Sequence, residues 1–417
     1  MKRLASIAAL VFATLAVAGA QTPLTSVAGQ VIDVTTDAAV SGGVRLSAGM
    51  TAALRSEPPQ KTGPIATPPT ITEQPLIRAI YNWSDDVAVI TEQWATSRTG
   101  SIYGLAIVDP RVSRIVPFRA ISCDSYEDVG YSEQLGKIIV CRRGDAAQLY
   151  RSTQQGWMKF SDAVHGPEFR CTVDRDRIAL ISDAAVYVFS TAPQQPRARI
   201  DIGFQKIPSF SGPLVPSATL LSEDSILLAY DAGEFGGALY RINLNGPTRP
   251  IKLLGDNIKF LARSPSGAIW AASGRAHLMG EHGALYRIDG TEPHVVASIS
   301  GLLMGTGPPS ISERSGVEFP ALTTVAGLAF ENTERPIVVL PELGVFELGG
   351  DRFTPRYREM LLRKYGESLH GSPVIVSSFP VGLVTTASGD MYVASRSLGV
   401  FWIRRNGQEL SLEQLTF

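Results

Sequence analysis

The chain has 417 residues, and its 38 Lys and Arg residues almost cancel its 39 Asp and Glu residues, giving a formal net charge of −1 at pH 7. This balance argues against a general binder of nucleic acids or anionic membranes, which needs an excess of basic residues. Only 18% of the residues are charged, whereas Gly (39) and Pro (27) are abundant. Such a composition favours many short strands joined by tight turns.

The first twenty residues have the pattern of a secretory signal peptide. Two basic residues precede an apolar run over residues 4–17, and the small residues that signal peptidase needs end at Ala20. No later stretch reaches about 18 uninterrupted apolar residues, so we expect no membrane span. The sequence therefore predicts a secreted or periplasmic protein whose mature chain begins at Gln21.

Residues 21–74 differ in character from the rest of the mature chain. Two short apolar stretches within residues 21–56 predict a small β segment. Residues 57–74 are rich in proline, which favours an extended linker. The β segment either stands alone or adds strands to the edge of the domain that follows at residues 75–417.

The domain at residues 75–417 contains a repeat. The hexapeptide Gly-Ala-Leu-Tyr-Arg-Ile at residues 237–242 recurs at residues 283–288, which is 46 residues further along. A period near 45 in a β-rich chain is typical of a propeller, in which each repeat is one small sheet packed on its neighbours. We expect the tyrosines of the two copies, Tyr240 and Tyr286, to pack between sheets. The arginines that follow them are expected to face outward or to bridge neighbouring sheets.

Seven hairpins follow one plan, in which an apolar strand, a polar turn and a second apolar strand lead to a third strand. The turns lie at residues 84–85, 134–136, 174–176, 223–225, 265–267, 332–335 and 388–390. The third strands begin near Tyr103, Ala147, Ala185, Gly237, Gly283, Gly344 and Gly399. A fourth strand follows most of them. The sequence therefore predicts an all-β fold, a seven-bladed β-propeller of four-stranded antiparallel blades.

Two of these hairpins carry a family resemblance. Each turns at Ser-Gly and continues into a strand with an aromatic residue, small residues and a Ser, at residues 269–273 and 391–396, the second of which ends in Arg396. Gly399 leads the strand after the second of them. This pattern resembles the two-component-regulator and NHL-type repeats of bacterial β-propellers. The resemblance implies the propeller fold but no particular activity, because propellers carry many unrelated functions.

Three cysteines are present, and the export that the signal peptide implies places them in an oxidising compartment. Cys123 and Cys141 can close one disulfide, which leaves Cys171 over. The alternative is three buried thiols. No Cys-x-x-Cys or Cys/His spacing indicates a zinc site.

Two long connections between blades, at residues 301–324 and 354–380, flank the same blade, so we expect them to wall one mouth of the propeller. The second contains the signals of a short helix. Thr354 suits the cap, Pro355 the first helical position and Gly366 the end. We expect this helix either to plug the mouth or to act as a lid.

Polar residues gather in the loops between second and third strands at the same face. The loop at residues 274–282 holds two histidines and a glutamate, and imidazole and carboxylate groups suit metal binding or general acid–base chemistry. A Gly-Glu pair shared by two of these loops has the alternative role of shaping the turn. The catalytic candidates are Glu281, His282, His277, Glu234 and His370. The ligand-binding candidates are Arg275, Asp231, Arg363 and Lys364.

No local enzyme motif appears in the sequence, which lacks the Gly-x-Ser-x-Gly elbow, the His-Glu-x-x-His motif, the phosphate loop and the dinucleotide glycine pattern. We therefore expect an exported propeller that binds a small molecule or a protein, but no nucleic acid, through its loop-rich face. The alternative is a propeller hydrolase or lactonase that uses a divalent metal or an acid–base pair from the same loops.

Overall fold

The computed structural model describes most of the domain at residues 75–417. Within this domain it leaves undescribed residues 94–101, 191–195, 197, 203–214, 234–235, 246–248, 278–279, 302–309, 312–324, 341–343, 350–351, 358–362, 368–372, 378–379, 387, 397–398, 407–408 and 416. Residues 1–74 also lie outside the described residues, so the signal peptide, the short β segment and the linker stay predictions.

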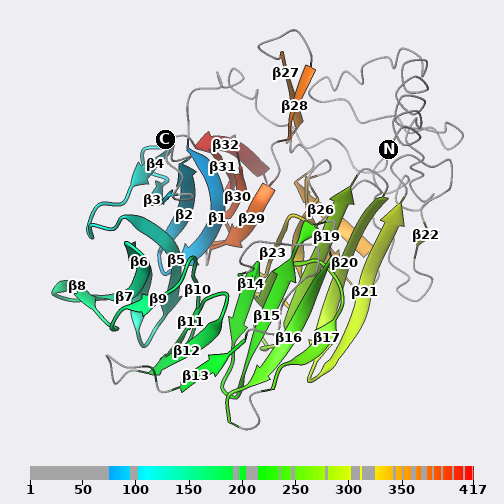
Figure 1. Ribbon diagram of the computed structural model, residues 1–417. Helices are drawn as coiled ribbons and strands as arrows, with labels where there is room; N and C mark the ends of the chain where they lie inside the picture. The colour runs from blue at the N-terminus through cyan, green and yellow to red at the C-terminus, as the bar shows by residue number, and fades with distance from the viewer. Residues whose placement is uncertain are drawn as a thin grey trace, which may run out of the picture. The chain divides into compact units, whose positions relative to one another are not determined.

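The described residues form seven blades, and each blade uses four consecutive strands in chain order (Figure 1). Blade 1 contains β1 (Leu76–Trp83), β2 (Asp86–Gln93), β3 (Ile102–Asp109) and β4 (Arg114–Pro117). Blade 2 contains β5 (Ser125–Ser132), β6 (Gly136–Arg143), β7 (Ala146–Thr153) and β8 (Gly156–Lys159), and β9 (Val164–His165) also pairs with β7. Blade 3 contains β10 (Arg170–Asp174), β11 (Arg177–Ile181), β12 (Ala185–Ser190) and β13 (Ala198–Asp201).

The second half of the domain continues the same plan. Blade 4 contains β14 (Ala218–Leu221), β15 (Ser225–Asp231), β16 (Gly237–Asn243) and β17 (Ile251–Leu254). Blade 5 contains β18 (Ile258–Arg263), β19 (Ile269–His277), β20 (Gly280–Asp289) and β21 (Glu292–Gly301), with β22 (Ser310–Ile311) as a fifth strand. Blade 6 contains β23 (Gly327–Ala329), β24 (Ile337–Leu340), β25 (Gly344–Gly349) and β26 (Arg352–Tyr357). Blade 7 contains β29 (Pro380–Thr385), β30 (Met391–Ser395), β31 (Gly399–Asn406) and β32 (Glu409–Leu415).

The first strands of the blades form a closed ring. Each contacts the first strand of the next blade, in the order β1, β5, β10, β14, β18, β23 and β29, and β29 contacts β1 again. In Figure 1 the blue strand β1 lies beside the orange strand β29. The predicted seven-bladed β-propeller of four-stranded antiparallel blades is therefore confirmed.

Seven hydrophobic clusters among the described residues fill the spaces between neighbouring blades. Successive side chains of a strand point to opposite faces, so each sheet contributes to the cluster on either side of it. In β6, for example, Ile138 and Val140 pack against blade 3, whereas Ile139 and Cys141 pack against blade 1. The strands are accordingly apolar on both faces, and the core is divided among the blade interfaces.

The repeated hexapeptide takes part in these interfaces, as predicted. Tyr240 packs against the cluster shared by blades 3 and 4, and Tyr286 belongs to the cluster shared by blades 4 and 5. Arg241 bridges two blades, because its Nη1 donates to the carbonyl oxygen of Gly290 at 3.1 Å. The side chain of Arg287 is half exposed. The repetition of this segment is thus explained by packing between blades.

Blades 1 and 7 close the ring without sharing a strand, since each takes all four of its strands from one end of the domain. The amide of Ile77 donates to the carbonyl oxygen of Arg396 at 2.7 Å. A Cβ on Gly382 would lie 2.8 Å from Cγ2 of Ile80, so the glycine permits β29 to approach β1 closely. Side-chain packing and a few hydrogen bonds therefore hold this seam, where Tyr392 stacks on Trp402 within blade 7.

The helix predicted after Thr354 is wrong. Thr354 and Pro355 belong to β26, the fourth strand of blade 6, where Pro355 pairs with Phe346 at an irregularity of the ladder. Proline has no N–H to donate, and an outermost strand tolerates this because one of its edges is unpaired. Gly366 lies in β27 (Arg363–Glu367), which forms a separate hairpin with β28 (Pro373–Ser377).

The loop predicted at residues 274–282 is also shorter than expected. β19 runs on to His277 and β20 begins at Gly280, so the two strands continue as a hairpin almost to its tip. Backbone pairing joins Arg275 to His282 and His277 to Gly280. The sequence signal for a loop here was the abundance of glycine and polar residues, but strand pairing continues through them.

Gly237 leads the repeated hexapeptide, and replacing it with alanine should destabilise the protein. A Cβ there would lie 2.3 Å from the carbonyl oxygen of Tyr230 and 2.7 Å from Cα of Asn257. Backbone atoms cannot turn aside, so we expect Gly237→Ala to lower the free energy of unfolding by about 1–3 kcal/mol. Urea titration followed by circular dichroism measures this loss.

The matched control for this prediction is Gly255→Ala. A Cβ at Gly255 would meet only the flexible end of the Lys252 side chain, at 3.5 Å or more. We expect that variant to stay within about 0.5 kcal/mol of the unchanged protein. Equal stabilities of the two variants would show that the close approach at Gly237 is not present in solution.

Candidate functional site

The two faces of the propeller differ in which connections they carry. Each first strand leads to the second through a short turn, such as residues 84–85 in blade 1, and these turns define the turn face. Antiparallel pairing then places the starts of the first and third strands and the ends of the second strands at the opposite face, the loop face. The connections that enter each blade also lie there.

Three first strands bring charged side chains to the loop face. Arg78 is the third residue of β1, Glu127 and Asp128 lie near the start of β5, and Arg170 opens β10. Glu168 precedes β10, and Arg142 lies near the end of β6. These residues are called the charged cluster: Arg78, Glu127, Asp128, Arg142, Glu168 and Arg170.

An ion pair within the cluster joins blade 1 to blade 3. Nη2 of Arg78 donates to Oε1 of Glu168, and Nη2 of Arg170 lies 3.6 Å from the same oxygen. Because β1 and β10 both contact β5, the Arg78–Glu168 bond spans the first strand of blade 2. The side chain of Arg78 is 16% exposed, that of Glu168 is 22% exposed and that of Arg170 is 15% exposed. Solvent reaches these three side chains and that of Arg142, which is 17% exposed.

An aromatic ring supports the Arg78 guanidinium. Its Cζ lies 4.0 Å from the ring centroid of Tyr103, a distance at which a cation and an aromatic face attract each other. Burial lowers the pKa of Arg78, but Glu168 and Tyr103 together raise it further than burial lowers it. Arg78 therefore stays charged.

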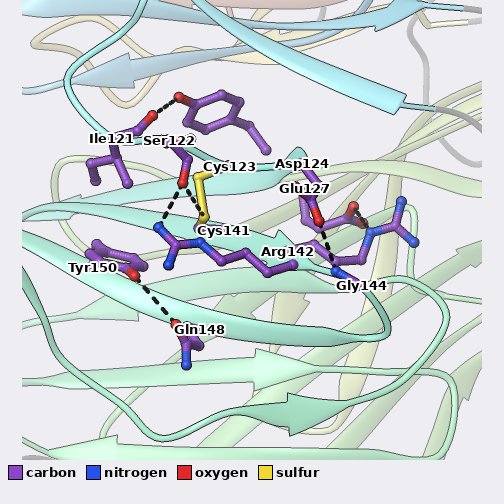
Figure 2. The surroundings of a disulfide bond; sticks show 12 residues. Ile121, Ser122, Cys123, Asp124, Glu127, Cys141, Arg142, Gly144, Gln148 and Tyr150 are labelled. Atoms are coloured by element: carbon purple, nitrogen blue, oxygen red, sulfur yellow. Dashed lines mark hydrogen bonds and ion pairs between the residues drawn. A yellow bond between two sulfur atoms is a disulfide. The ribbon is translucent and has the colours of Figure 1, made fainter.

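Glu127 is the most deeply buried carboxylate of the cluster, with 0% of its side chain exposed. Its Oε1 lies 2.8 Å from Nε of Arg142 on the neighbouring strand. Burial raises the pKa of Glu127, and the attraction of Arg142 opposes that rise. Figure 2 shows the two side chains beside the disulfide that is described below.

Asp128 links blade 2 to blade 3. Its Oδ1 accepts the amide of Val129 at 2.9 Å, and its Oδ2 accepts the amide of Cys171 at 2.8 Å. Burial raises the pKa of Asp128, against the opposing effects of Arg170 and of the hydrogen bond from Tyr81. Both carboxylate oxygens are thus occupied by donors of the protein itself.

One disulfide lies next to the cluster. Cys123, in the connection that enters blade 2, is bonded to Cys141 in β6, with 5.5 Å between their Cα atoms (Figure 2). Of the two alternatives left open by the sequence, the bridge is therefore the one the structure shows. Cys171 is the free thiol, and burial raises its pKa well above the usual value, so it is unreactive. Arg142 directly follows the bonded Cys141.

The structure places those candidates that it describes outside blades 1 to 3. Asp231 ends β15, where its Oδ1 accepts the Gly233 amide at 3.0 Å and Nδ2 of Asn257 at 2.8 Å. It thus braces a turn and joins blade 4 to blade 5. The backbone of β19 and β20 carries Arg275, His277, Glu281 and His282, that of β27 carries Arg363 and Lys364, and Glu234 and His370 lie outside the described residues.

Sequence reasoning missed the charged cluster, although one signal pointed to it. Glu127 and Asp128 are adjacent acidic residues inside a predicted first strand. First strands of a propeller are largely buried, so two carboxylates in a row there require charged or hydrogen-bonding partners. That those partners are Arg142 and Arg170 depends on which strands are neighbours.

The described part of the chain lacks two further features. No three His, Cys, Asp or Glu side chains lie together there as ligands for a metal ion. No helix there has the length and hydrophobicity that a membrane span requires.

No model of a known protein family matches the chain, and no curated protein matches it. Several solved structures are similar to it over most of its length. The extracellular domain of BT4673 from B. thetaiotaomicron is 10% identical to this chain, with a TM-score of 0.47. The match covers 81% of this chain and 39% of the BT4673 chain, so this chain spans well under half of the length of that protein. The β-propeller domain of the Trilobed protease from Pyrococcus furiosus is 11% identical with a TM-score of 0.48, covering 84% and 97%. The WD40 propeller domain of Doa1 is 10% identical with a TM-score of 0.45, covering 81% and 95%. At these identities the likeness concerns the fold alone.

Proposed function

We propose that the chain is an exported β-propeller that binds a small molecule or a protein partner at its loop face, with the charged cluster at the centre of the binding site. The observation that carries this proposal is the convergence of Arg78, Arg170 and Glu168 from two different blades, with part of each side chain exposed. Ring-shaped scaffolds commonly place ligands where several blades meet.

The energetics of the cluster support recognition over stability as its role. Removing charges from water costs several kcal/mol per ion, and apolar residues of similar volume often give equal or greater stability. The blade interfaces of this protein are otherwise filled by apolar clusters. Six charged residues at one place therefore favour a function for which charge is needed.

The cluster fits binding better than catalysis. A general acid or base must reach a substrate atom within hydrogen-bond distance. Glu127 has no exposed surface, and both oxygens of Asp128 already accept hydrogen bonds from backbone amides. The hydrolase or lactonase alternative depends on Glu281, His282 and the other loop candidates, and it stays a prediction.

The test compares one ion pair at each face. Arg396 pairs with Glu92 at 3.2 Å at the loop face, and Arg175 pairs with Glu223 at 3.3 Å at the turn face. Thermal unfolding of the mature chain with a panel of sugars, lactones, carboxylic acids and short peptides identifies a ligand. Arg396→Glu should weaken that ligand about tenfold, equivalent to about 1.4 kcal/mol, whereas Arg175→Glu should leave it unchanged.

The opposite pattern, with binding lost only in Arg175→Glu, would move the site to the turn face and contradict the proposal. Turnover of a lactone in the panel would instead favour the hydrolase. A partner whose binding both variants retain would place the interface away from both ion pairs and would contradict binding at this part of the loop face.

A further inference from the structure

Two largely buried guanidinium groups of the cluster approach the same carboxylate. Arg78 and Arg170 both approach Oε1 of Glu168, although each guanidinium has a planar fork of donors that suits two oxygens. No described residue accepts a hydrogen bond from Nη1 of Arg78. The pair therefore has more donors than Glu168 uses.

The other two carboxylates of the cluster do not serve as substitutes. Glu127 faces Arg142, and Asp128 accepts two backbone amides in addition to its attraction to Arg170. Both are completely or almost completely buried. Glu168 is thus the one cluster carboxylate that both meets solvent and faces the Arg78 guanidinium.

The backbone on either side of Glu168 is fixed, so its side chain is the part that can move. Phe169 is buried in the hydrophobic cluster shared by blades 2 and 3. The carbonyl oxygen of Pro167 accepts a hydrogen bond from Nη1 of Arg142 at 3.1 Å. Rotation of the Glu168 side chain into solvent would expose the two guanidinium groups without moving the blades.

We infer that the Arg78–Arg170 pair is a binding site for a carboxylate group and that Glu168 occupies it in the free protein as an internal competitor. The inference rests on the proposed function and names its ligand class. An incoming carboxylate takes the place of the Glu168 carboxylate and carries the same charge. The buried arginines therefore remain neutralised throughout the exchange. The ring of Tyr103, already against Arg78, holds the guanidinium in place for the ligand.

The first experiment removes the competitor and supplies the smallest ligand. Glu168→Ala leaves the two guanidinium groups without Glu168, and sodium acetate provides a carboxylate that fits the vacated space. We expect acetate to raise the unfolding temperature of Glu168→Ala more than that of the unchanged protein, whereas sodium chloride at the same ionic strength does not. Glu168→Gln is the control for volume, because its amide fills the space and should blunt the response.

A second experiment distinguishes the two sources of such a group. Succinate represents a free acid, and N-acetyl-dialanine represents a peptide C-terminus, with its C-terminal amide as the uncharged control. By calorimetry, one of the two carboxylates should bind Glu168→Ala at least tenfold more tightly than the unchanged protein, and the amide should bind neither. Arg78→Gln in the same background should abolish the gain.

The assignment is overturned if acetate and chloride affect Glu168→Ala equally, or if the gain survives Arg78→Gln. Arg170→Gln keeps Glu168 and serves if Glu168→Ala does not fold, since it should weaken the same carboxylate about tenfold in an otherwise unchanged site. A ligand that binds the loop face equally in all these variants would refute the carboxylate site and move the binding site away from the charged cluster, and only binding at the loop face would still stand.

Discussion

Replacing Arg142 with methionine should lower the free energy of unfolding by about 3–5 kcal/mol near pH 7, because it leaves the Glu127 carboxylate buried without its counter-charge. Methionine keeps most of the length of the arginine side chain, so the loss reports the charge more than the packing. Chemical denaturation, with the slope against denaturant checked for constancy, measures it.

The loss should depend on pH in a defined direction. Burial raises the pKa of Glu127 in the folded protein. Between its ordinary value and the raised value the folded protein binds more protons than the unfolded chain, so stability falls as the pH rises through that interval. Without Arg142 the folded pKa rises further and the interval extends upward. The destabilisation by Arg142→Met should therefore grow as the pH rises above the ordinary pKa of a glutamate carboxyl, and it should be smallest at the acid end.

Two controls separate charge from packing. In Glu127→Gln/Arg142→Met no buried charge remains, so this double variant should recover most of the stability and lose the pH dependence. Arg111→Met breaks an exposed pair with Asp109, in which the arginine side chain is 87% exposed, and should leave the free energy of unfolding almost unchanged. If the double variant is as unstable as Arg142→Met, then packing of the arginine stem is what the protein needs.

The repeat architecture follows from local signals, which explains why the sequence predicts it well. The predicted third strands at Ala185, Gly237, Gly344 and Gly399 begin where β12, β16, β25 and β31 begin. Polar turns and alternating apolar residues act over a few residues, and a blade is assembled from neighbours in sequence. No long-range information is needed to recognise such a unit.

The helix after Thr354 was mispredicted because the same residues serve two structures. A capping threonine followed by proline begins many helices, but it also suits an edge strand, in which proline loses no ladder bond. The arbitrating fact is that blade 6 needs a fourth strand, and residues 352–357 supply it. That requirement follows from the blade as a whole, so it cannot be recognised from the capping residues alone.

The charged cluster depends on contacts that the chain order hides. Arg78 and Glu168 are 90 residues apart, in blades that are not adjacent. Sequence reasoning placed the polar candidates in glycine-rich loops, because polar residues in loops are easy to see. The ring instead brings together charged residues from strand ends. In the sequence each of them stands among apolar residues and does not attract notice.

Removing the disulfide should destabilise the protein and weaken the cluster together. Cys123 and Cys141 are 18 residues apart, and closing a loop of this size stabilises a fold by about 3 kcal/mol. We expect Cys123→Ser/Cys141→Ser to lose about this amount in urea unfolding. Cys171→Ala is the control for loss of a thiol without loss of a bridge.

The position of the disulfide predicts that its contribution to stability is coupled to the buried ion pair. Arg142 follows Cys141 directly, and Glu127 lies on the strand that the connection through Cys123 enters, so the bridge fixes both partners of the buried ion pair. Part of the free energy of unfolding that the disulfide contributes should therefore depend on the Glu127–Arg142 ion pair. We expect the disulfide variant to cost less in the Arg142→Met background than in the unchanged protein, by more than the about 0.5 kcal/mol within which independent sites add. Strict additivity would mean that the bridge constrains only the unfolded chain and that the charged cluster is held by the blades alone.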